Sequence, residues 1–529
     1  MERKGKSKRR SKKSTDTARG WIYTRKIIQF LTLAVCLLLI LGLQGLKIPY
    51  SLAKLPILLD PLAILTNLLA SRMFLTSSLL ALITISLTIV FGRAWCGWVC
   101  PLGTILDLLT PARTDNERFY MVPPSWRVAK FLLLIMILIL ALLGNQTLMI
   151  FDPVTIFIRT FTIGIFPALD RVITAIEAYL YGFPSFGEII TEVDTWFRPG
   201  IFPVEPEQYP YGWLFILILV GLIAMNWIAP RFFCRYLCPL GGFLALISKG
   251  ALLRRRVETD CKSCGRCNEV CPTGTIDPMN GFVSDPSECT MCLECLNACP
   301  RDSINFRMPR SISQIYSLAE WNEYDPGRRE ALFAIGGALV ATILFRIQPL
   351  FTQENPFLLL PPGAQGNDFQ SACIRCGLCM RVCPTGGLQP AISEAGIAGL
   401  WTPVLVPRLG YCDYACNNCG LVCPVHAIPS LDLEQKRKQT IGIAEIDQER
   451  CIAWADHLDC IVCEEMCPVP DKAIRLEEVF VTNAEGRVVL LKLPHMIREN
   501  CIGCGICEYQ CPVEGAAAIR VLASQLVTV

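Results

Sequence analysis

The chain alternates between long apolar runs and stretches of ordinary polarity. Four apolar runs precede residue 230, at residues 27–46, 73–91, 128–148 and 213–229. About 20 apolar residues span the ~30 Å hydrocarbon core of a bilayer as a helix. The pattern therefore predicts an α-helical integral membrane bundle with four spans. A shorter run between Arg329 and Arg346 predicts a fifth span, and packing of that run on the bundle without crossing is the alternative.

The second half of the chain has a different texture. Short strand-like runs at residues 440–446 and 488–493 each precede a cysteine-rich segment. Such runs are typical of small α+β domains. We therefore expect α+β ferredoxin-like modules beside the membrane bundle.

The four spans read as one two-helix unit used twice. The first unit ends in FGRAWCGWVCPLG at residues 91–103, and the second ends in PRFFCRYLCPLG at residues 230–241. Two parallel repeats predict a pseudo-two-fold axis along the membrane normal. That axis would gather the motif cysteines at one face and the two Asp-Pro pairs at the other. The residues concerned are Cys96, Cys100, Cys234 and Cys238 at the first face, and Asp60 and Asp152 at the second.

Charge predicts which face is cytoplasmic. The chain carries a formal net charge of +3, while residues 1–26 contain eleven Lys or Arg and two acidic residues, a net +9, which leaves −6 for the rest. A basic arm before a membrane helix is a topology signal, so no nucleic-acid partner is expected. The loops at 92–130 and 230–260 are rich in Arg, and the loop at 150–211 is acidic. We expect the arm and the Arg-rich loops in the cytoplasm.

Cysteines carry the candidate chemistry. Six quartets, each ending in Cys-Pro, use 24 of the 29 cysteines. The first two have the spacing of bacterial two-cluster ferredoxins, in which the fourth cysteine of each run ligates the other cluster. Zinc uses the same Cys-x2-Cys spacing, but complete quartets with Cys-Pro ends favour [4Fe–4S] clusters. The six quartets are Cys261, Cys264, Cys267 and Cys271; Cys289, Cys292, Cys295 and Cys299; Cys373, Cys376, Cys379 and Cys383; Cys412, Cys416, Cys419 and Cys423; Cys451, Cys460, Cys463 and Cys467; and Cys501, Cys504, Cys507 and Cys511.

The six quartets predict six [4Fe–4S] clusters. In the first module, Cys299 is expected to complete the first cluster and Cys271 the second. In the second half, the third quartet pairs with the fourth and the fifth with the sixth, or the pairs are nested. The spacing leaves both arrangements open.

Two further sets of residues are candidates for function. We expect the four motif cysteines to ligate a metal or cluster, or to line the electron path into the first module. The alternative is a role in packing or as a reversible thiol couple. Asp60 and Asp152 are candidates for a quinol and proton site, because a carboxylate at the membrane rim accepts protons. Their alternative role is to cap a turn before proline.

Several cofactors lack a site in the sequence. The three histidines all lie after residue 400, so the membrane part offers no ligands for haem b. No Cys-x-x-Cys-His motif for covalent haem occurs. A Gly-x-Gly-x-x-Gly loop before a helix is also missing, so neither a flavin nor a nicotinamide site is evident.

These features divide the chain into six parts. We expect a basic cytoplasmic arm at 1–26, a four-span membrane domain at 27–250, a two-cluster module at 251–308 and a linker with the fifth span at 309–349. A second linker at 350–372 and a four-cluster domain at 373–529 follow. Residues 230–327 should be cytoplasmic and residues 350–529 on the outer side of the membrane.

Two family resemblances cover nearly the whole chain. The segment from the basic arm to Pro300 resembles the NapH-type membrane quinol-dehydrogenase ferredoxin subunit, which also has four spans, two Cys-x3-Cys-Pro motifs and two quartets. The segment from Arg328 onward resembles the NapG/MauM-type four-cluster ferredoxin, which is exported by a twin-arginine signal. Matching stretches include CIRCGLCMRVCPTGGLQP at 373–390 and DCIVCEEMCP at 459–468. The chain thus looks like a fusion of the two subunits.

The resemblance implies a multi-pass protein of the cytoplasmic membrane that takes electrons from the quinone pool. It would pass them through [4Fe–4S] clusters to a periplasmic-side reductase or c-type cytochrome. Whether the chain is itself the quinol-oxidising enzyme or only a carrier stays open. The alternatives are an assembly factor for a metalloenzyme, like the RdxA/CcoG-type membrane ferredoxins, or electron transfer from a cytoplasmic ferredoxin.

Overall fold

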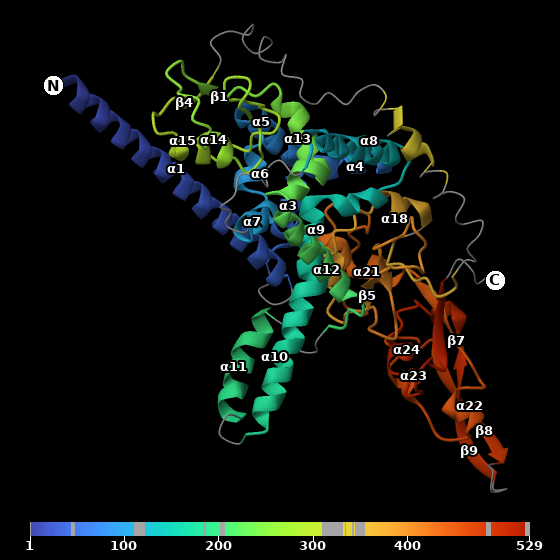
Figure 1. Ribbon diagram of the computed structural model, residues 1–529. Helices are drawn as coiled ribbons and strands as arrows, with labels where there is room; N and C mark the ends of the chain where they lie inside the picture. The colour runs from blue at the N-terminus through green and yellow to red at the C-terminus, as the bar shows by residue number, and fades with distance from the viewer. Residues whose placement is uncertain are drawn as a thin grey trace. The chain divides into compact units, whose positions relative to one another are not determined.

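The structure is a computed structural model with two compact units (Figure 1). It describes residues 2–43, 48–110, 122–183, 187–201, 207–308, 355–364, 366–482 and 488–523, with isolated positions between 329 and 343. The first unit comprises residues 1–39, 55–160 and 214–342. The second comprises residues 40–54, 161–213 and 343–529. Each unit is therefore assembled from segments that are far apart in the sequence.

A group of apolar helices forms the centre of the first unit. Helices α4, α5, α8 and α13 pack against one another, and Figure 1 shows them together. Leu134, Ile137 and Leu140 of α8 are buried in this contact. The helices of this unit are α1 (Glu2–Leu41, whose end belongs to the second unit), α3 (Leu55–Leu58), α4 (Pro61–Ser71), α5 (Ala81–Phe91), α6 (Ala94–Trp98), α7 (Pro101–Leu108), α8 (Val128–Leu142), α9 (Pro153–Arg159), α12 (Gly212–Ala224) and α13 (Pro239–Ser248).

Two of the four predicted spans coincide with helices long enough to cross a bilayer. These helices run over Arg19–Leu41 and Ser125–Leu142, and both are strongly apolar. The runs at 73–91 and 213–229 coincide with shorter apolar helical segments, Thr76–Phe91 and Gly212–Trp227. Within the described residues, helix length therefore supports two crossings rather than four or five. Arg328 lies outside the described residues, and the run proposed as a fifth span is described only in part, as helix at 329, 332–333, 335–340 and 343.

Four helices of the first unit begin at an X-Pro pair. Proline fits the first helical position because its missing N–H would have no intrahelical partner there. Asp60 and Asp152 precede the prolines that open α4 and α9. Cys100 and Cys238 precede those that open α7 and α13. The repeat seen in the sequence thus recurs as matched helix starts.

A two-cluster-type module follows α13. Strand β1 (Arg254–Val257) pairs antiparallel with β4 (Ile304–Arg307), and β2 (Ile276–Asp277) pairs with β3 (Val283–Ser284). Two short helices, α14 (Arg266–Glu269) and α15 (Glu294–Ala298), pack together between these strands. Cys267, Ile276 and Phe282 are among the residues that form the core. The expected α+β fold is confirmed for this module.

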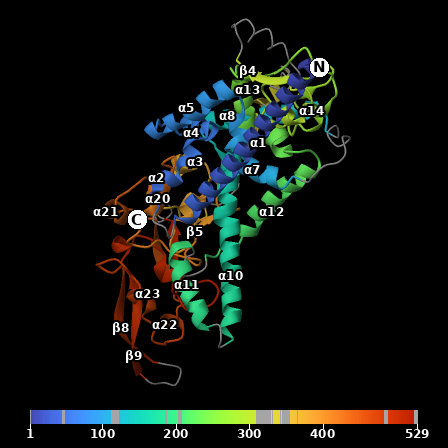
Figure 2. The same ribbon diagram turned by 90° about the vertical axis from the view of Figure 1, so that its left-hand side faces the viewer.

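The second unit contains a helical pair and a cysteine-rich domain. Helices α10 (Phe166–Tyr181) and α11 (Gly187–Ile201) lie side by side (Figures 1 and 2). The predicted strands at 440–446 and 488–493 appear as β7 and β9. The other elements are α2 (Tyr50–Ala53), α18 (Gly366–Ala372), α19 (Leu378–Arg381), β5 (Leu388–Pro390), β6 (Pro403–Leu405), α20 (Asn418–Val422), α21 (Leu433–Arg437), β7 (Gly442–Ile446), α22 (Ile452–Ala455), α23 (Val462–Glu465), β8 (Ile474–Thr482), β9 (Val488–Met496), α24 (Ile506–Tyr509) and β10 (Ile519–Ala523).

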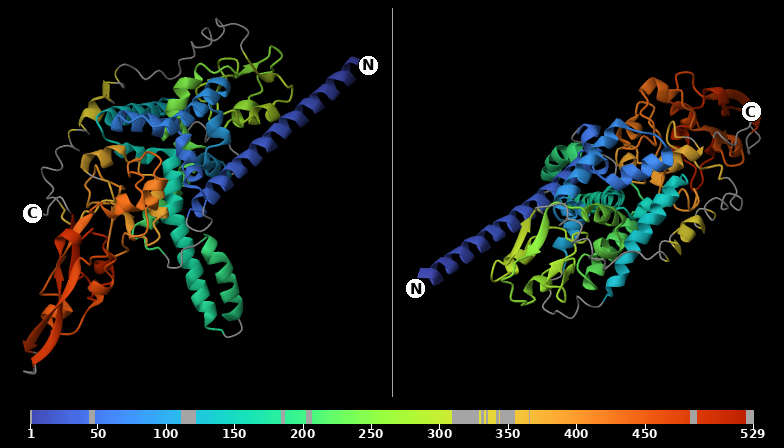
Figure 3. Two further views of the ribbon diagram at one scale, coloured as in Figure 1. Left: turned by 180° about the vertical axis from the view of Figure 1, so that it is seen from behind. Right: turned by 90° about the horizontal axis from the view of Figure 1, so that it is seen from above.

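The strands of the cysteine-rich domain form separate two-stranded ribbons. β5 pairs with β6, β7 with β10, and β8 with β9, all antiparallel. The β8–β9 ribbon is the longest, and it extends away from the short helices of the domain (Figure 3). Its inner face, with Leu491 and Leu493, packs on Cys451 and Ala453. Because ribbons this small bury little apolar surface, their stability depends on the packing around the cysteines.

Candidate iron–sulfur sites and the motifs beside them

The first module brings its eight cysteines together in two crossed sets. One cavity is lined by Cys261, Cys264, Cys267 and Cys299. A second is lined by Cys271, Cys289, Cys292 and Cys295. We call these sites 1 and 2. In each site the fourth cysteine comes from the other quartet, which is the exchange that the spacing predicts.

The third and fourth quartets exchange cysteines in the same way. Cys376 and Cys379 lie near enough to Cys423 to interact electrostatically. Cys412, Cys416 and Cys419 lie similarly close to Cys383. Site 3 is therefore Cys373, Cys376, Cys379 and Cys423, and site 4 is Cys412, Cys416, Cys419 and Cys383.

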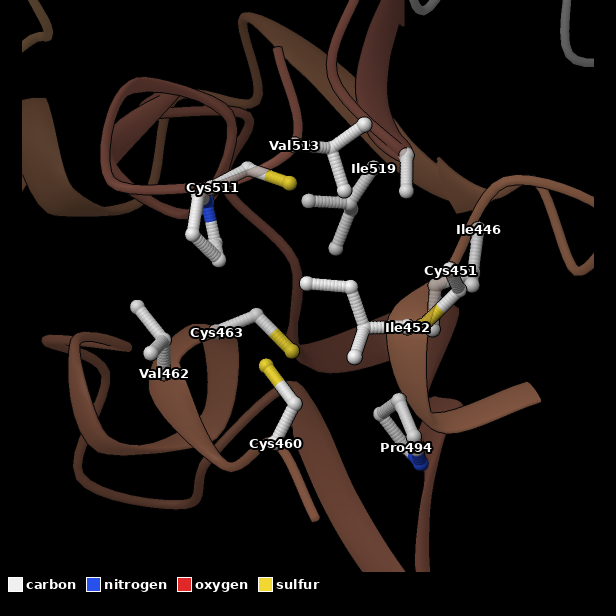
Figure 4. A pocket seen from close by; sticks show the side chains of 12 residues that line it. Ile446, Cys451, Ile452, Cys460, Val462, Cys463, Pro494, Cys511, Val513 and Ile519 are labelled. Carbon is white, nitrogen blue, oxygen red and sulfur yellow. The ribbon is translucent and has the colours of Figure 1, made fainter. Parts of the chain in front are cut away.

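The fifth and sixth quartets form the second pair of this domain. Figure 4 shows the side chains of Cys451, Cys460, Cys463 and Cys511 around one small cavity, which is site 5. Cys467, Cys501, Cys504 and Cys507 line the neighbouring cavity, site 6. The structure thus resolves the pairing that the sequence left open, third with fourth and fifth with sixth.

A left-handed residue follows the second cysteine in four of the six quartets. Gly265, Gly377 and Gly505 have φ angles of 75°, 85° and 82° there. Leu293 occupies the same position with φ 66°, an uncommon conformation for a residue with a side chain. The turn starts the short helix that carries the third cysteine. The fourth and fifth quartets, whose first spacing is widened, have ordinary φ angles at this position, −133° at Asn417 and −118° at Ile461.

The donor sets fit iron–sulfur clusters. Each site offers four thiols, and at site 5 the space between them is lined largely by apolar side chains such as Ile446, Val462 and Ile519. Across the described chain, no three His, Cys, Asp or Glu side chains converge at the spacing of a single metal ion. Burial raises the pKa of the Cys463 thiol to about 12, so iron has to displace a proton when it binds. When bound, a cluster supplies one-electron transfer.

The two Cys-x3-Cys-Pro motifs meet in the first unit. Cys96, Cys100, Cys234 and Cys238 are all buried and close enough to interact electrostatically. Gly103 N donates a hydrogen bond to Cys100 Sγ at 3.4 Å, and Gly241 N donates one to Cys238 Sγ at 3.2 Å. Each of these sulfurs therefore caps a helix start, where the helix dipole favours negative charge.

Two buried arginines tie the repeats to each other. Arg93 of the first repeat donates to the carbonyl oxygen of Cys234 at 3.4 Å. Arg231 of the second donates to the carbonyl oxygen of Cys96 at 3.1 Å. This reciprocal exchange is what a pseudo-two-fold relation between the repeats requires. Both arginines are 1% exposed, so both need the carboxylate partners described next.

Acidic residues neutralise these arginines. Arg93 Nη1 lies 2.9 Å from Glu288 Oε2, and Lys130 contacts the other oxygen of the same carboxylate. Asp107 accepts two hydrogen bonds from Arg231, both at 2.5 Å. Glu288 directly precedes Cys289 of site 2. The second motif and site 2 are thus joined through Arg93, which contacts both the Cys234 carbonyl oxygen and Glu288.

Site 2 also touches the first motif directly. Trp98 Nε1 donates to the carbonyl oxygen of Met291 at 3.0 Å. A Cβ added at Gly97 would stand 2.2 Å from the carbonyl oxygen of Thr290, so only glycine fits there. Thr290 and Met291 lie in the turn between Cys289 and Cys292. The four motif cysteines are therefore placed beside site 2 rather than beside site 1.

Asp60 and Asp152 form a fully buried pair. Their carboxyl groups lie close enough to interact electrostatically, and among the described residues Asp60 Oδ2 and Asp152 Oδ1 are buried without another hydrogen-bond partner. Each also accepts two backbone N–H groups at a helix start: Asp60 Oδ1 from Leu62 and Ala63, and Asp152 Oδ2 from Val154 and Thr155. The aspartates thus cap helices, as one of the two interpretations of the sequence expected, and they also meet; their role as a quinol and proton site stays a prediction.

The surroundings of the pair favour a bound proton. Two ionised carboxylates repel each other in a buried place, so Asp60 and Asp152 are favoured with one of the two groups protonated. Burial and the neighbouring carboxyl raise the pKa of Asp60 well above its ordinary value, and burial raises that of Asp152. Such a pair titrates as a unit, with one proton shared between two groups.

In the second unit, residues between the predicted spans pack on sites 3 and 4. Tyr209 is buried and donates from its hydroxyl to the carbonyl oxygen of Met380 at 3.1 Å. Glu207 lies 3.6 Å from Arg381 in a buried ion pair. Tyr50 and Lys54 lie within electrostatic range of Cys416 and Cys423. Both inter-span segments of this unit thus contact the same half of the cysteine-rich domain.

Comparison with known proteins agrees with these sites. A 4Fe-4S binding domain family matches twice, at residues 73–115 and 211–259, which are the two repeats. A 4Fe-4S dicluster domain matches residues 254–300, and a further 4Fe-4S binding domain matches residues 369–389. No solved structure matches the chain.

Curated relatives identify the family. The methylamine utilization ferredoxin-type protein MauM of Methylorubrum extorquens is 39% identical over 173 residues, which are 32% of this chain and 74% of MauM. MauM of Paracoccus denitrificans is 35% identical over 38% of this chain and 86% of the relative. The ferredoxin-type protein NapG of Escherichia coli is 34% identical over 37% of this chain and 83% of NapG. The chain belongs to the MauM/NapG family.

This membership supports the resemblance of the C-terminal half. It also shows that the chain is an iron–sulfur electron-transfer protein with ferredoxin domains. The MauM/NapG match accounts for about a third of the chain. The likeness of the N-terminal half to a quinol-dehydrogenase subunit stays a prediction.

Several residues that contact the cysteine sites of this MauM/NapG-type chain could not be predicted from the sequence. Glu288, Glu207 and Tyr209 carry no motif, and only the fold shows that they contact the cysteine sites. Lys130 did leave a signal, because a lysine inside an apolar run is expensive unless it is paired. A search for charged residues in the predicted spans would have found it.

Proposed function

We propose that this protein oxidises quinol in the cytoplasmic membrane and passes the electrons through [4Fe–4S] clusters to a periplasmic-side reductase or c-type cytochrome. The observation that carries the proposal is the buried Asp60–Asp152 pair. Oxidation of one quinol releases two electrons and two protons. A carboxyl pair that holds one proton has room for one more, so it takes the two protons in turn by passing the first on to water at the membrane rim before the second arrives.

The surroundings of the pair favour this role over a purely structural one. Asn or Ser would cap each helix about as well as Asp without burying two carboxyl groups side by side. Bringing two fully buried carboxyls together costs free energy, because like charges and desolvation both oppose ionisation. Paired carboxylates with displaced pKa values are typical of sites that move protons.

The other parts of the proposal extend this site. The repeats would cross the membrane four times, with Thr76–Phe91 and Gly212–Trp227 as the shorter crossings. The motif cysteines Cys96, Cys100, Cys234 and Cys238 would connect the quinol site with site 2, and the six cysteine sites would hold six clusters. The membrane lipid supplies the quinone pool.

Quinol-dependent cluster reduction tests the proposal. The protein should carry about 24 iron atoms per chain if it holds six clusters. Membranes that contain it are mixed anaerobically with a short-chain quinol. Bleaching of the cluster absorbance is followed over time. Asp60→Asn and Asp152→Asn should each slow reduction by about 100-fold or more, the usual contribution of an acid–base group.

The exposed Asp471→Asn is the matched control and should leave the rate unchanged. Dithionite should still reduce the clusters of every variant, which shows that they are present. Quinol reduction of both pair variants at the normal rate would refute the assignment of the pair. An assembly factor would show no quinol-dependent reduction even in the unaltered protein.

A further inference from the structure

The four cysteine sites of the C-terminal domain do not lie in the order of the sequence. Sites 3 and 4 are neighbours, because α19 and α20, which carry their third cysteines, pack together and Cys379 lies near Cys419. Sites 5 and 6 are neighbours in the same way, through α23 and α24. The question is which member of each pair joins the two.

A hydrogen bond between two cysteines of different pairs answers it. Cys412 N of site 4 donates to the carbonyl oxygen of Cys504 of site 6 at 2.8 Å. The thiols of these residues are also within electrostatic range of each other. Beside them, the rings of Tyr411 and Tyr509 lie 5.4 Å apart, centroid to centroid. Tyr411 and Cys412 beside site 4 thus contact Cys504 and Tyr509 beside site 6.

The other end of the series is at site 5. Cys460 is partly exposed, and it follows an insertion in which Asp456, Leu458 and Asp459 are all exposed. At the opposite end, sites 3 and 4 are covered by Tyr209, Tyr50 and Lys54 from the inter-span segments. Site 5 is thus remote in sequence and in contacts from the segments that lead to the membrane part.

We propose that the four sites form one linear series, in the order 3, 4, 6, 5, so that the fifth quartet of the sequence is the terminal site. Electrons enter at the pair of sites 3 and 4, which faces the inter-span segments, and leave one at a time at site 5 to an external one-electron acceptor protein. This direction of flow rests on the proposed function. The spatial order does not, because it follows from contacts within the domain.

Spin coupling between reduced clusters tests the order without any quinol. Two neighbouring paramagnetic clusters broaden and split each other's electron paramagnetic resonance signals, whereas an isolated cluster gives a simple spectrum. The full-length protein is reduced with dithionite, and iron is measured on the same sample. Sites 1 and 2 contribute equally to all spectra and cancel in differences between variants.

Cys504→Ser should remove site 6 and about four iron atoms per chain. If the order is 3, 4, 6, 5, site 5 then gives an isolated, uncoupled signal while sites 3 and 4 remain coupled. Cys463→Ser should remove site 5 and leave sites 3, 4 and 6 mutually coupled. An isolated site 6 signal in Cys463→Ser would overturn the proposal, because it would place site 5 between sites 4 and 6.

Cys463→Ser still tests the order of the four sites if the loss of site 6 in Cys504→Ser unfolds the domain. Quinol then provides a separate readout of direction: in Cys504→Ser it should reduce sites 3 and 4 but not site 5, which dithionite still reduces. Failure of quinol to reduce any site in the unaltered protein would refute the proposed function while the coupling pattern still tests the order.

Discussion

At the scale of residues, the first unit depends on buried charges that neutralise one another across the repeats. Glu288 is 2% exposed and contacts both Arg93 and Lys130, which are 1% and 0% exposed. Breaking a buried ion pair by removing one partner leaves an uncompensated charge, which costs far more than the pair itself contributes. One carboxylate therefore controls the junction between the apolar helices and site 2.

Glu288→Gln should destabilise this junction by about 3–5 kcal/mol, because two buried cations lose their counter-charge. The measurement is the urea concentration at which sites 1 and 2 lose their clusters, followed by absorbance. Glu258→Gln is the matched control, since its ion pair with Arg307 is 43% and 62% exposed. That change should cost less than about 1 kcal/mol. Equal effects of the two substitutions would contradict the account.

The same carboxylate predicts sensitivity to acid. Burial would raise the pKa of Glu288, but Lys130 and Arg93 lower it from an ordinary value of 4.5 to about 2. Because the folded pKa lies below the unfolded one, the stabilisation is complete above pH 4.5 and is lost as the pH falls toward 2. The unaltered protein should therefore become less stable over this range, while Glu288→Gln should show a flatter profile.

At the scale of elements, sequence spacing predicted the cysteine sites better than it predicted the helices. The exchange of Cys271 and Cys299 followed from a known pattern, because three thiols close in sequence and one remote thiol leave few ways to assign the fourth ligand of each site. The four-span expectation counted apolar residues, whereas the runs at 73–91 and 213–229 form helical segments of fewer than 18 residues, Thr76–Phe91 and Gly212–Trp227. The X-Pro pairs did mark helix starts, as proline at the first position leads one to expect.

The contacts between elements were beyond prediction for a physical reason. A hydrogen bond such as that from Cys412 N to Cys504 O joins backbone groups, which have no signature in the side chains. The meeting of Asp60 and Asp152 was foreshadowed only by the repeat, which placed both at one face. Glu207 contacts Arg381, which lies 174 positions later in the chain, and no periodicity encodes such a separation.

Arg408 links the two halves of the cysteine-rich domain, one with sites 3 and 4 and the other with sites 5 and 6. Arg408 donates to the carbonyl oxygens of Glu508, Cys511, Val513 and Gly515 at distances of 2.5–3.1 Å. Arg408→Lys keeps the charge but loses the planar fork. It should lower the stability of sites 5 and 6 by about 2 kcal/mol or more, as loss of several charge-assisted hydrogen bonds does.

The release of iron from the domain in urea measures this effect. Arg450→Lys serves as the control, because exposed Arg450 makes one such bond, to the carbonyl oxygen of Ala516 at 2.9 Å. That substitution should change stability by less than about 1 kcal/mol. If Arg408→Lys behaved like Arg450→Lys, the fork would not be what holds the two halves together.

At the scale of the whole molecule, each unit shows which chain segments its ferredoxin part contacts. The first module contacts Arg25, Arg93 and Arg127, which flank the apolar helices on the Arg-rich side. The C-terminal domain contacts residues 50–54 and 207–209, which come from the intervening segments. If the chain crosses the membrane four times, as we propose, alternate segments lie on opposite faces. The contacts within the two units thus agree with the charge pattern.

We therefore predict that residues 350–529 face outward while residues 230–327 face inward. Positive residues are retained on the cytoplasmic side during insertion, and the first module is attached to the positive segments. Protease added to sealed, right-side-out vesicles should release fragments of the C-terminal domain and leave the Cys261–Cys299 module intact. Detergent should make both accessible, which controls for intrinsic resistance. Protection of both modules in sealed vesicles would place all six cysteine sites in the cytoplasm, and a periplasmic acceptor would then have to be abandoned.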